Sequence, residues 1–257
     1  MQVVILAGGL GTRLSEETSL KPKPMVEIGG QPMLWHIMKT YAHYGHKDFI
    51  VCLGYKGHIV KEYFANFFLY QSDVSIDLKN NKIEIHNTAS EDWTVTLVDT
   101  GPETQTGARI KKIEKYIKGE NFMLTYGDGL SNVNINELLA FHQKNGKIGT
   151  MTSIQPEGRF GALDIDANGQ VTKFIEKPKG DGNWINGGFF ILNKEFFNYL
   201  SQQEDLILEK EPLEGLVKNG QLMTFRHHGF WKCMDTLRDK TQLENMWQSG
   251  KAPWKVW

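Results

Sequence analysis

Short hydrophobic runs recur along the chain, separated by longer stretches in which apolar residues have helical spacing. Residues 3–6 form one continuous run that stops at Gly8, and residues 49–53 form a second that stops at Gly54. Uninterrupted runs of this length are typical of strands buried on both faces of a sheet. Further strand-like segments are residues 94–98, 122–126 and 187–192.

Helical patterns lie between these runs. Pro32 predicts a helix start, and residues 58–69 carry large apolar side chains at helical spacing, which we assign to the core. Asn134 and Glu137 resemble a capping box at another helix start. Further helices are expected after a cap at Thr106, near residues 205–218 and near residues 236–247.

The alternation of strands and helices predicts an α/β protein with a mainly parallel sheet and helices on both faces. From residue 150 onward strands become more frequent, and Asn168-Gly169 predicts a hairpin turn, as Asn80-Asn81 does earlier. In open parallel sheets ligands bind beyond the carboxyl ends of the strands. Chemistry is therefore expected near Gly8 and Asp128.

Composition excludes several functional classes. The chain has 257 residues, and its 29 basic residues nearly balance its 30 acidic ones, which disfavours nucleic acid as the main partner. No apolar run reaches the roughly 18 residues that a spanning helix needs, so we expect no membrane partner. Cys52 and Cys233 are too few for a disulfide framework and indicate a cytoplasmic protein with reduced thiols.

The first candidate site is the glycine-rich segment of residues 6–14, directly after the first strand. Without Cβ atoms, Gly8, Gly9 and Gly11 would let an anion or a flat base approach the backbone, and Arg13 could bind phosphate oxygens. The segment lacks the third glycine of a dinucleotide fingerprint and the Gly-Lys-Ser/Thr of a Walker loop. Taken alone, it is equally explained as a tight structural turn.

A lysine between two prolines follows about a dozen residues later. Pro22 and Pro24 stiffen the backbone around Lys23, so that its ammonium can be aimed at one point. An ordinary proline-containing surface loop is the alternative. Together with the glycine segment, Lys23 and Arg13 indicate two cations that converge on one polyphosphate.

Two carboxylates are candidate metal ligands. Asp128 follows the strand over 122–126 and lies between glycines, whereas Asp235 precedes the helix expected near residue 236. Mg²⁺ favours one or two protein carboxylates together with phosphate oxygens. Asp128 could equally be a turn residue, and for Asp235 alone a helix N-cap is the stronger interpretation.

A fourth segment combines acid and base at the end of the Asn168-Gly169 hairpin. Glu176 next to Lys177 could bind a sugar hydroxyl and a phosphate from one strand end, or could belong to a charged strand edge. The tryptophans near the C-terminus, such as Trp254, are unusual in a free tail. We favour their packing onto the domain over a subunit contact.

These segments resemble the sugar-1-phosphate nucleotidyltransferases. Residues 8–13 and 22–25 match the signature of the family as a whole. The resemblance continues along the chain and is closest to the branch that joins CTP to glucose 1-phosphate. The segments that carry it are residues 18–38, 126–129, 158–163, 176–180, 229–231, 234–239 and 252–255.

The resemblance implies a reaction and a role for each matching residue. CTP and α-D-glucose 1-phosphate would give CDP-glucose and pyrophosphate, with Mg²⁺ as cofactor. Arg13, Lys23 and Asp128 would be catalytic, and Asp128 and Asp235 would hold the metal. The nucleotide would contact Leu6, Ala7, Gly8, Gly9, Leu10, Gly11, Thr12, Arg13, Thr104, Arg109 and Gly127, with Thr104 and Arg109 at the base. The sugar phosphate would contact Lys23, Glu176, Lys177, Lys179 and Asn186.

The family also implies an architecture. It is a three-layer αβα, Rossmann-like nucleotide-diphospho-sugar transferase fold with a mixed, mainly parallel sheet and a β-rich sugar-binding half. We expect a single domain with a nucleotide half (1–130), a sugar-phosphate half (131–235) and a C-terminal helix and tail (236–257). The family is oligomeric, so we expect a homo-oligomer, with a hexamer among the candidates. Such enzymes feed bacterial surface polysaccharides such as lipopolysaccharide O-antigens.

Three alternatives stay open at this point. The nucleotide could be UTP or dTTP. The chain could be a sugar-nucleotide-binding subunit that has lost catalysis, although Arg13, Lys23, Asp128 and Asp235 are all present. An NAD-dependent oxidoreductase would also begin with a strand and glycines, but the missing third glycine disfavours it.

Overall fold

A seven-stranded sheet forms the centre of the computed structural model, which describes residues 1–9, 11–87, 90–156, 162–166, 169–175 and 183–257. The strand order is β14-β10-β13-β8-β1-β4-β7. These strands are β1 (Gln2–Ala7), β4 (Asp48–Leu53), β7 (Thr94–Asp99), β8 (Asn121–Tyr126), β10 (Gly149–Ile154), β13 (Ile185–Asn193) and β14 (Leu222–His227). Strand β13 runs antiparallel to both of its neighbours, and the other neighbouring pairs are parallel, which confirms a mixed, mainly parallel sheet.

Strand β1 shows why the sequence forms this layer. Its residues are buried throughout, and they alternate between two hydrophobic clusters. Val3 and Ile5 pack into one cluster, and Val4 and Leu6 pack into the other, on the opposite face. A strand with both faces buried needs no polar alternation, and this explains the continuous hydrophobic run.

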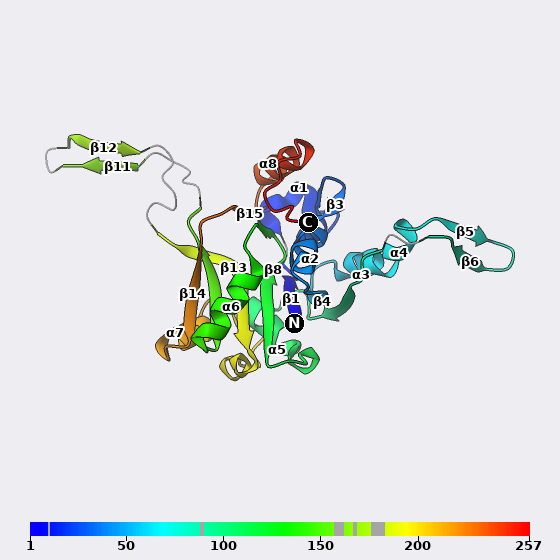
Figure 1. Ribbon diagram of the computed structural model, residues 1–257, viewed down its shortest axis with the longest axis horizontal. Coiled ribbons are helices and arrows are strands. Elements are labelled where there is room, and N and C mark those ends of the chain that lie inside the picture. Colours follow the sequence, from blue (N-terminus) through cyan, green and yellow to red (C-terminus); the bar gives the residue numbers. More distant parts are fainter. Residues whose placement is uncertain (10, 88–89, 157–161, 167–168, 176–182) are drawn as a thin grey trace.

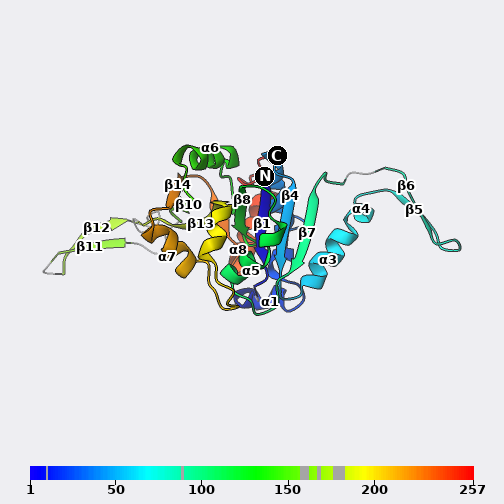
Figure 2. The ribbon, with the colours of Figure 1, turned by 90° about the horizontal axis from the view of Figure 1, so that it is seen from below.

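Helices cover both faces and complete three layers (Figure 2). The first cluster contains residues of α2 (Met33–His43), α6 (Ile135–Asn145) and α8 (Leu237–Gln248). The second contains residues of α5 (Thr106–Lys112), the 3₁₀ segment η5 (Lys194–Tyr199) and α7 (Glu211–Lys218). Short helical turns are η1 (Thr12–Leu14), α1 (Ser15–Thr18), η2 (Lys23–Met25) and η3 (Glu114–Tyr116). No helix among the described residues is long and apolar enough to cross a membrane.

Three helix expectations need correction. The stretch 58–69 is interrupted at Asn66, giving α3 (Gly57–Ala65) and α4 (Phe67–Tyr70). Its aromatic residues are half-buried or exposed, and of these Tyr63 and Phe64 pack against the first cluster. Helix α5 has Gln105 at its N-cap, because the Thr106 hydroxyl accepts a hydrogen bond from Leu208 N instead. The helix expected from residue 205 begins only at Glu211. By contrast, the Asn134 side chain does cap α6.

Two-stranded hairpins extend from opposite sides of the core (Figure 1). One pairs β5 (Val74–Asp77) with β6 (Lys82–Ile85), and the other pairs β11 (Ala162–Ile165) with β12 (Val171–Ile175), as the turn signals predicted. Smaller pairs are β2 (Glu27–Ile28) with β3 (Gln31–Pro32) and β9 (Gly129–Ser131) with β15 (Trp231–Cys233).

The C-terminal tryptophans pack onto the core, as the sequence favoured. Trp254 is fully buried, and its ring Nε1 lies 3.4 Å from Nδ1 of His36, which is also fully buried. His36 Nε2 lies 2.8 Å from the Ile28 carbonyl oxygen, an arrangement that suits a neutral ring. Burial lowers the pKa of His36 to about 4, so the ring is uncharged at neutral pH.

Candidate active site

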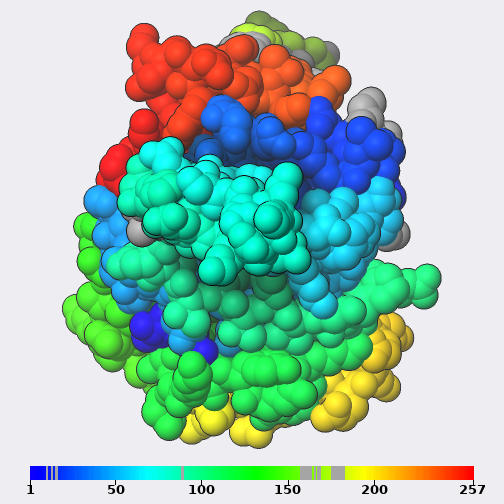
Figure 3. Space-filling view, turned by 90° about the vertical axis from the view of Figure 1, so that its right-hand side faces the viewer, coloured from blue at the N-terminus to red at the C-terminus, as the bar shows by residue number. Residues whose placement is uncertain are grey.

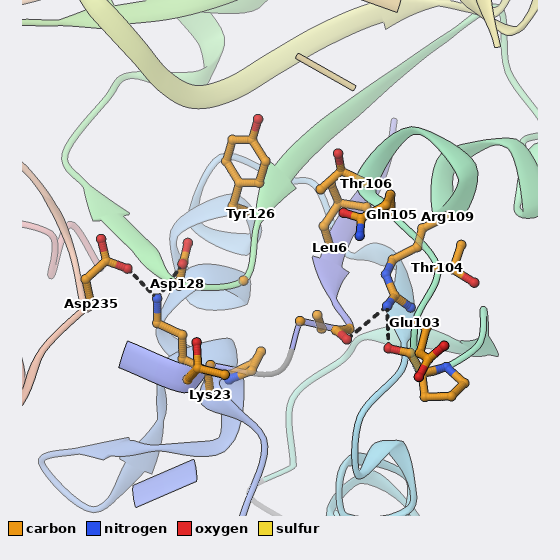
Figure 4. A pocket seen from close by; sticks show the side chains of 18 residues that line it. Leu6, Lys23, Glu103, Thr104, Gln105, Thr106, Arg109, Tyr126, Asp128 and Asp235 are labelled. Carbon is orange, nitrogen blue, oxygen red and sulfur yellow. Dashed lines mark hydrogen bonds and ion pairs between the residues drawn. The ribbon is translucent and has the colours of Figure 1, made fainter. Parts of the chain in front are cut away.

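A pocket of about 630 Å³ lies at the carboxyl ends of β1 and β8 (Figure 4). Of the residues expected at the site, those that line it are Leu6, Ala7, Gly8, Gly9, Gly11, Thr12, Lys23, Thr104, Arg109, Gly127, Asp128 and Asp235. The pocket lies where β1 leads into the glycine segment and β8 leads to Asp128. These are the two places where the sequence predicted a functional site. In Figure 4, Lys23 with the two carboxylates lies on one side of the pocket, and Arg109 with Thr104 lies on the other.

Lys23 lies between the two aspartates. Its Nζ is 2.7 Å from Asp128 Oδ2 and 2.7 Å from Asp235 Oδ1. Lys23 is only 9% exposed. Burial by itself would lower its pKa, but the charges and hydrogen bonds of the two carboxylates outweigh burial and raise it above the ordinary value. Lys23 is thus a permanently charged ammonium that faces the pocket.

The small β9–β15 sheet brings the two aspartates together, although they are far apart in the sequence. Cys233 of β15 pairs with Gly129 of β9, and Met234 N donates to the Asp128 carbonyl at 2.9 Å. The interpretation of Asp235 as an N-cap is wrong. Thr236 caps α8 in a capping box with Asp239, and this leaves the Asp235 side chain to face Lys23.

The Cys233 thiol donates to the second oxygen of Asp235, with 3.3 Å between Sγ and Oδ2. Burial, with a further contribution from Asp235, raises the pKa of Cys233 to about 12. The thiol therefore stays protonated and remains a donor at neutral pH.

Arg109 occupies the other side of the pocket and is 4% exposed. One terminal nitrogen donates to the carbonyl oxygens of Leu53 at 3.0 Å and Gly101 at 2.7 Å, and to the Thr100 hydroxyl at 2.6 Å. The other donates to the Gly8 carbonyl at 2.9 Å and to the Pro102 carbonyl at 3.3 Å. The guanidinium thus ties the glycine segment to the end of β4 and to the turn after β7.

The glycines next to Arg109 make room for it. A Cβ added at Gly8 would lie 2.2 Å from Arg109 Cζ, and one added at Gly54 would lie 2.7 Å from an Arg109 terminal nitrogen. A Cβ at Gly9 would meet no protein atom within 4 Å. Gly8 is therefore required by the protein's own packing, whereas Gly9 leaves open space where a ligand could approach.

The outcome differs for the remaining expected residues. Asn186 is absent from the pocket lining, and its side-chain Nδ2 donates to the Tyr126 hydroxyl at 3.2 Å. The predictions for Leu10, Glu176, Lys177 and Lys179 lie outside the described residues, and only the backbone of Arg13 is described, in η1.

Six further lining residues were not predicted from the sequence to lie at the site. They are Pro24, Pro102, Glu103, Gln105, Thr106 and Tyr126. All are sequence neighbours of expected site residues. Their position next to Lys23, Thr104 and Gly127 is the signal that could have found them.

The aspartate pair suits a divalent cation bound together with phosphates. Within the described ranges, no three His, Cys, Asp or Glu side chains gather as a complete metal site. Hard cations such as Mg²⁺ bind phosphate-rich substrates through one or two carboxylates and complete their coordination with phosphate and water oxygens. Asp128 and Asp235, held within reach of the same ammonium, offer this kind of donor set.

The chain belongs to the nucleotidyl transferase family, whose model matches residues 2–236. Enzymes of this family generally use a divalent metal ion. The chain is similar to glucose-1-phosphate cytidylyltransferase of Salmonella typhi, with 57% identity over 100% of both chains. It is also similar to a probable glucose-1-phosphate cytidylyltransferase of Bacillus subtilis, with 43% identity over 100% of both chains.

The fold has a counterpart among solved structures. HddC from Yersinia pseudotuberculosis, crystallised with GMP-PN, matches with a TM-score of 0.69 and 24% identity, over 96% of this chain and 99% of that one. This likeness supports the fold and indicates no substrate for the present chain.

Proposed function

We propose that this protein is a glucose-1-phosphate cytidylyltransferase, which converts CTP and α-D-glucose 1-phosphate into CDP-glucose and pyrophosphate. The observation that supports the chemistry is the Lys23 ammonium held 2.7 Å from both Asp128 and Asp235 in a pocket at the strand ends. The choice of cytosine and glucose rests on the full-length 57% identity to the Salmonella typhi enzyme.

The reaction needs no covalent intermediate with the protein. An oxygen of the sugar phosphate attacks the α-phosphorus in line, and pyrophosphate leaves. Lys23 would face the α-phosphate and the sugar phosphate, and Arg13 would hold phosphates after the glycine segment. The positive charge of Lys23 would stabilise the negative charge that builds up on the phosphoryl oxygens.

A divalent cation, Mg²⁺ in our proposal, would be held by Asp128 and Asp235. When bound, it would neutralise phosphate charge and raise the electrophilicity of the α-phosphorus. The carboxylates now shared with Lys23 would orient both the cation and the ammonium.

The nucleotide would lie along the residues after β1. Gly9, Gly11 and Thr12 line the pocket beside the open space at Gly9 and would contact the nucleotide, together with Leu6, Ala7, Gly8, Leu10 and Gly127. The base would lie against the wall that includes Thr104 and Arg109. Glu176, Lys177, Lys179 and Asn186 are proposed for the sugar phosphate.

We also propose that the chain forms one domain, in which a nucleotide half (1–130) and a sugar half (131–235) share one sheet and a C-terminal segment (236–257) packs against it through α8. In support, β8 pairs with β1 of the first half and with β13 of the second. A cytoplasmic location accords with the free thiols of Cys52 and Cys233.

A homo-oligomer, up to a hexamer, is the proposed assembly. The β5–β6 hairpin stands out from the core toward the viewer in Figure 3, and it exposes Ile76, Leu78, Ile83 and Ile85. An apolar strand edge of this kind is usually covered by a partner. Light scattering should give a mass of several chains. Ile83→Asp should lower that mass, whereas Val217→Asp, at an exposed position of α7, should not.

Pyrophosphate release over a grid of nucleoside triphosphates and sugar 1-phosphates tests the activity. The highest kcat/KM is expected for CTP with glucose 1-phosphate. A preference for UTP or dTTP would overturn the cytidylyl assignment and leave the nucleotidyl transferase class intact. No release with any pair would favour a non-catalytic binding subunit.

A further inference from the structure

The segment of residues 204–209, which precedes α7, lies alongside residues 104–108, and Thr104, Gln105 and Thr106 of that stretch line the pocket. Glu204 O accepts a hydrogen bond from Gln105 N at 2.9 Å. Leu206 O accepts from Gly107 N at 2.9 Å and from Ala108 N at 3.1 Å. The second half of the chain thus satisfies the first backbone donors of α5, and the wall beside Arg109 is fixed from behind.

Glu204 binds this wall with its side chain as well. Its Oε2 accepts from the Thr104 hydroxyl at 2.6 Å and from Lys112 Nζ at 2.8 Å. Lys112 Nζ in turn donates to Thr104 Oγ1 at 3.1 Å and to the Thr100 carbonyl at 2.9 Å. The hydrogen bonds from Lys112 and Thr104 hold the pKa of Glu204 below its ordinary value.

The loop of residues 100–104 is therefore held on two sides by different charges. Arg109 binds the carbonyls of Gly101 and Pro102 from within the pocket wall. The Glu204–Lys112 pair binds residues 100 and 104. Thr104 is 6% exposed, and its single hydroxyl proton is donated to Glu204. The loop's polar groups are thus fixed in direction as well as in place.

We propose that Glu204, which does not line the pocket, is a positioning residue that fixes the base-facing wall and so contributes to the choice of nucleoside triphosphate. The inference rests on the proposed function, because it takes the 100–105 loop as the wall that faces the base. Glu204 is assigned no contact with the substrate.

The physical reason is the pattern of the pyrimidine edge. Cytosine presents a donor amine at C4 and an acceptor at N3, whereas uracil presents an acceptor and a donor. A rigid wall leaves its buried polar groups unpaired with the wrong base, and this is costly. A wall that can shift can re-pair those groups, so a loosened loop should lose selectivity before it loses chemistry.

Glu204→Gln tests the idea, because it keeps the shape of the side chain and removes its charge. We expect KM for CTP to rise roughly tenfold, with kcat little changed, since a charge-assisted hydrogen bond to the wall is weakened. The kcat/KM ratio of CTP over UTP should fall by about fivefold or more, because the wall becomes adaptable. Calorimetric titration with CTP should show the same weakening without turnover.

Asp205→Asn is the matched control. Asp205 is the adjacent exposed carboxylate, and its substitution removes the same charge from the same segment. It should leave KM, the CTP/UTP ratio and Tm unchanged. Lys112→Met removes the other member of the pair and should shift KM and the ratio in the same direction as Glu204→Gln.

An unchanged CTP/UTP ratio in a folded Glu204→Gln protein would overturn the inference, as would an equal change in Asp205→Asn. A drop in kcat with KM unchanged would also contradict a positioning role at the base. If the wild-type protein prefers another nucleotide, the proposed function fails. The ratio of its preferred to its next-best nucleotide should still fall in Glu204→Gln, so the two failures are distinguishable.

Discussion

Two buried cations lie on opposite sides of the pocket, and their partners differ in kind. Lys23 is held by the side-chain carboxylates of Asp128 and Asp235, whereas Arg109 is held mainly by backbone carbonyls, those of Gly8 and Leu53 among them. Carboxylates can exchange an ammonium for a metal ion or reorient when phosphates arrive. Backbone carbonyls at the ends of strands cannot move in this way without unfolding the loop.

Because their partners differ, we expect the two cations to have different roles in the same pocket. In our proposal Lys23 supplies a charge to the substrate, whereas Arg109 cross-links the segments that form the wall. The sequence-based expectation that Arg109 contacts the base stays a prediction. Its donors already bind the protein, so we expect its effect on the base to act through the loop it holds.

The largest expected effect follows removal of the divalent cation or of a carboxylate. EDTA should abolish turnover, and Asp128→Asn or Asp235→Asn should lower kcat by roughly 10³-fold, because the metal supplies several kcal/mol of charge stabilisation. Tm should stay within a few degrees. Near wild-type turnover of either variant at saturating Mg²⁺ would show that its carboxylate is not a ligand.

Lys23→Ala should lower kcat by about 10²-fold or more, by analogy with the loss of one preorganised donor. Lys21→Ala is the control. Lys21 is paired on the surface with Glu27, so its loss should leave kcat nearly unchanged. Steady-state kinetics with CTP and glucose 1-phosphate measure both. Equal effects at the two lysines would argue that general charge, rather than an aimed ammonium, is what matters.

A substitution that displaces Arg109 should lower thermal stability as well as activity. Gly8→Ala would place a Cβ 2.2 Å from Arg109 Cζ, so the guanidinium must shift. We expect kcat/KM for CTP to fall roughly tenfold and the CTP/UTP ratio to fall with it. Tm should also fall, by roughly 5 °C or more, because the framework bonds of Arg109 are lost.

Gly9→Ala supplies the contrast within the same loop. It meets no protein atom within 4 Å, so Tm should be unchanged and any loss should appear in KM for CTP. Thermal melts and kinetics of the two variants check the comparison. If both substitutions lower Tm equally, Arg109 is not the cross-link inferred from its contacts.

Arg109→Ala should lower the CTP/UTP ratio more than it lowers kcat with CTP, and it should lower Tm as well. Loss of the guanidinium leaves the carbonyls of Gly8 and Leu53 without this donor. Lys23→Ala should show the reverse pattern, with kcat lost and the ratio kept. If Arg109→Ala and Lys23→Ala changed kcat and the CTP/UTP ratio in the same way, the inferred difference between the two cations would be wrong.

The smallest effect concerns His36, a third buried basic side chain, which is neutral. Burial lowers its pKa from 6.5 to about 4, despite the opposing attraction of Glu244. Between pH 4 and 6.5 the unfolded state therefore binds more protons than the folded state does. The contribution of the neutral His36 ring to the free energy of unfolding is full above pH 6.5 and is lost as the pH drops toward 4. His36→Gln should flatten the dependence of Tm on pH in this window. Burial also lowers the pKa of His46 to about 4, so a weaker dependence of Tm on pH should remain in this variant.

The sequence alone determined the features that depend on local pattern. Continuous hydrophobic runs predicted β1, β4 and β8, and turn signals predicted both projecting hairpins. Glycines after a buried strand, a lysine between prolines and an aspartate at a strand end marked the pocket. Such signals are readable because each motif is continuous in the chain and strand ends of a parallel sheet share one edge.

Tertiary structure decided whatever depends on contacts between distant segments. Asp235 faces Lys23 because Thr236 takes over the cap of α8 and the β9–β15 pair carries the segment to the pocket. The pocket wall is held by Arg109 and Glu204, whose partners are backbone groups and side chains far away in the sequence. A carbonyl carries no sequence signature, so the residues that bind it become visible only when the chain has folded around them.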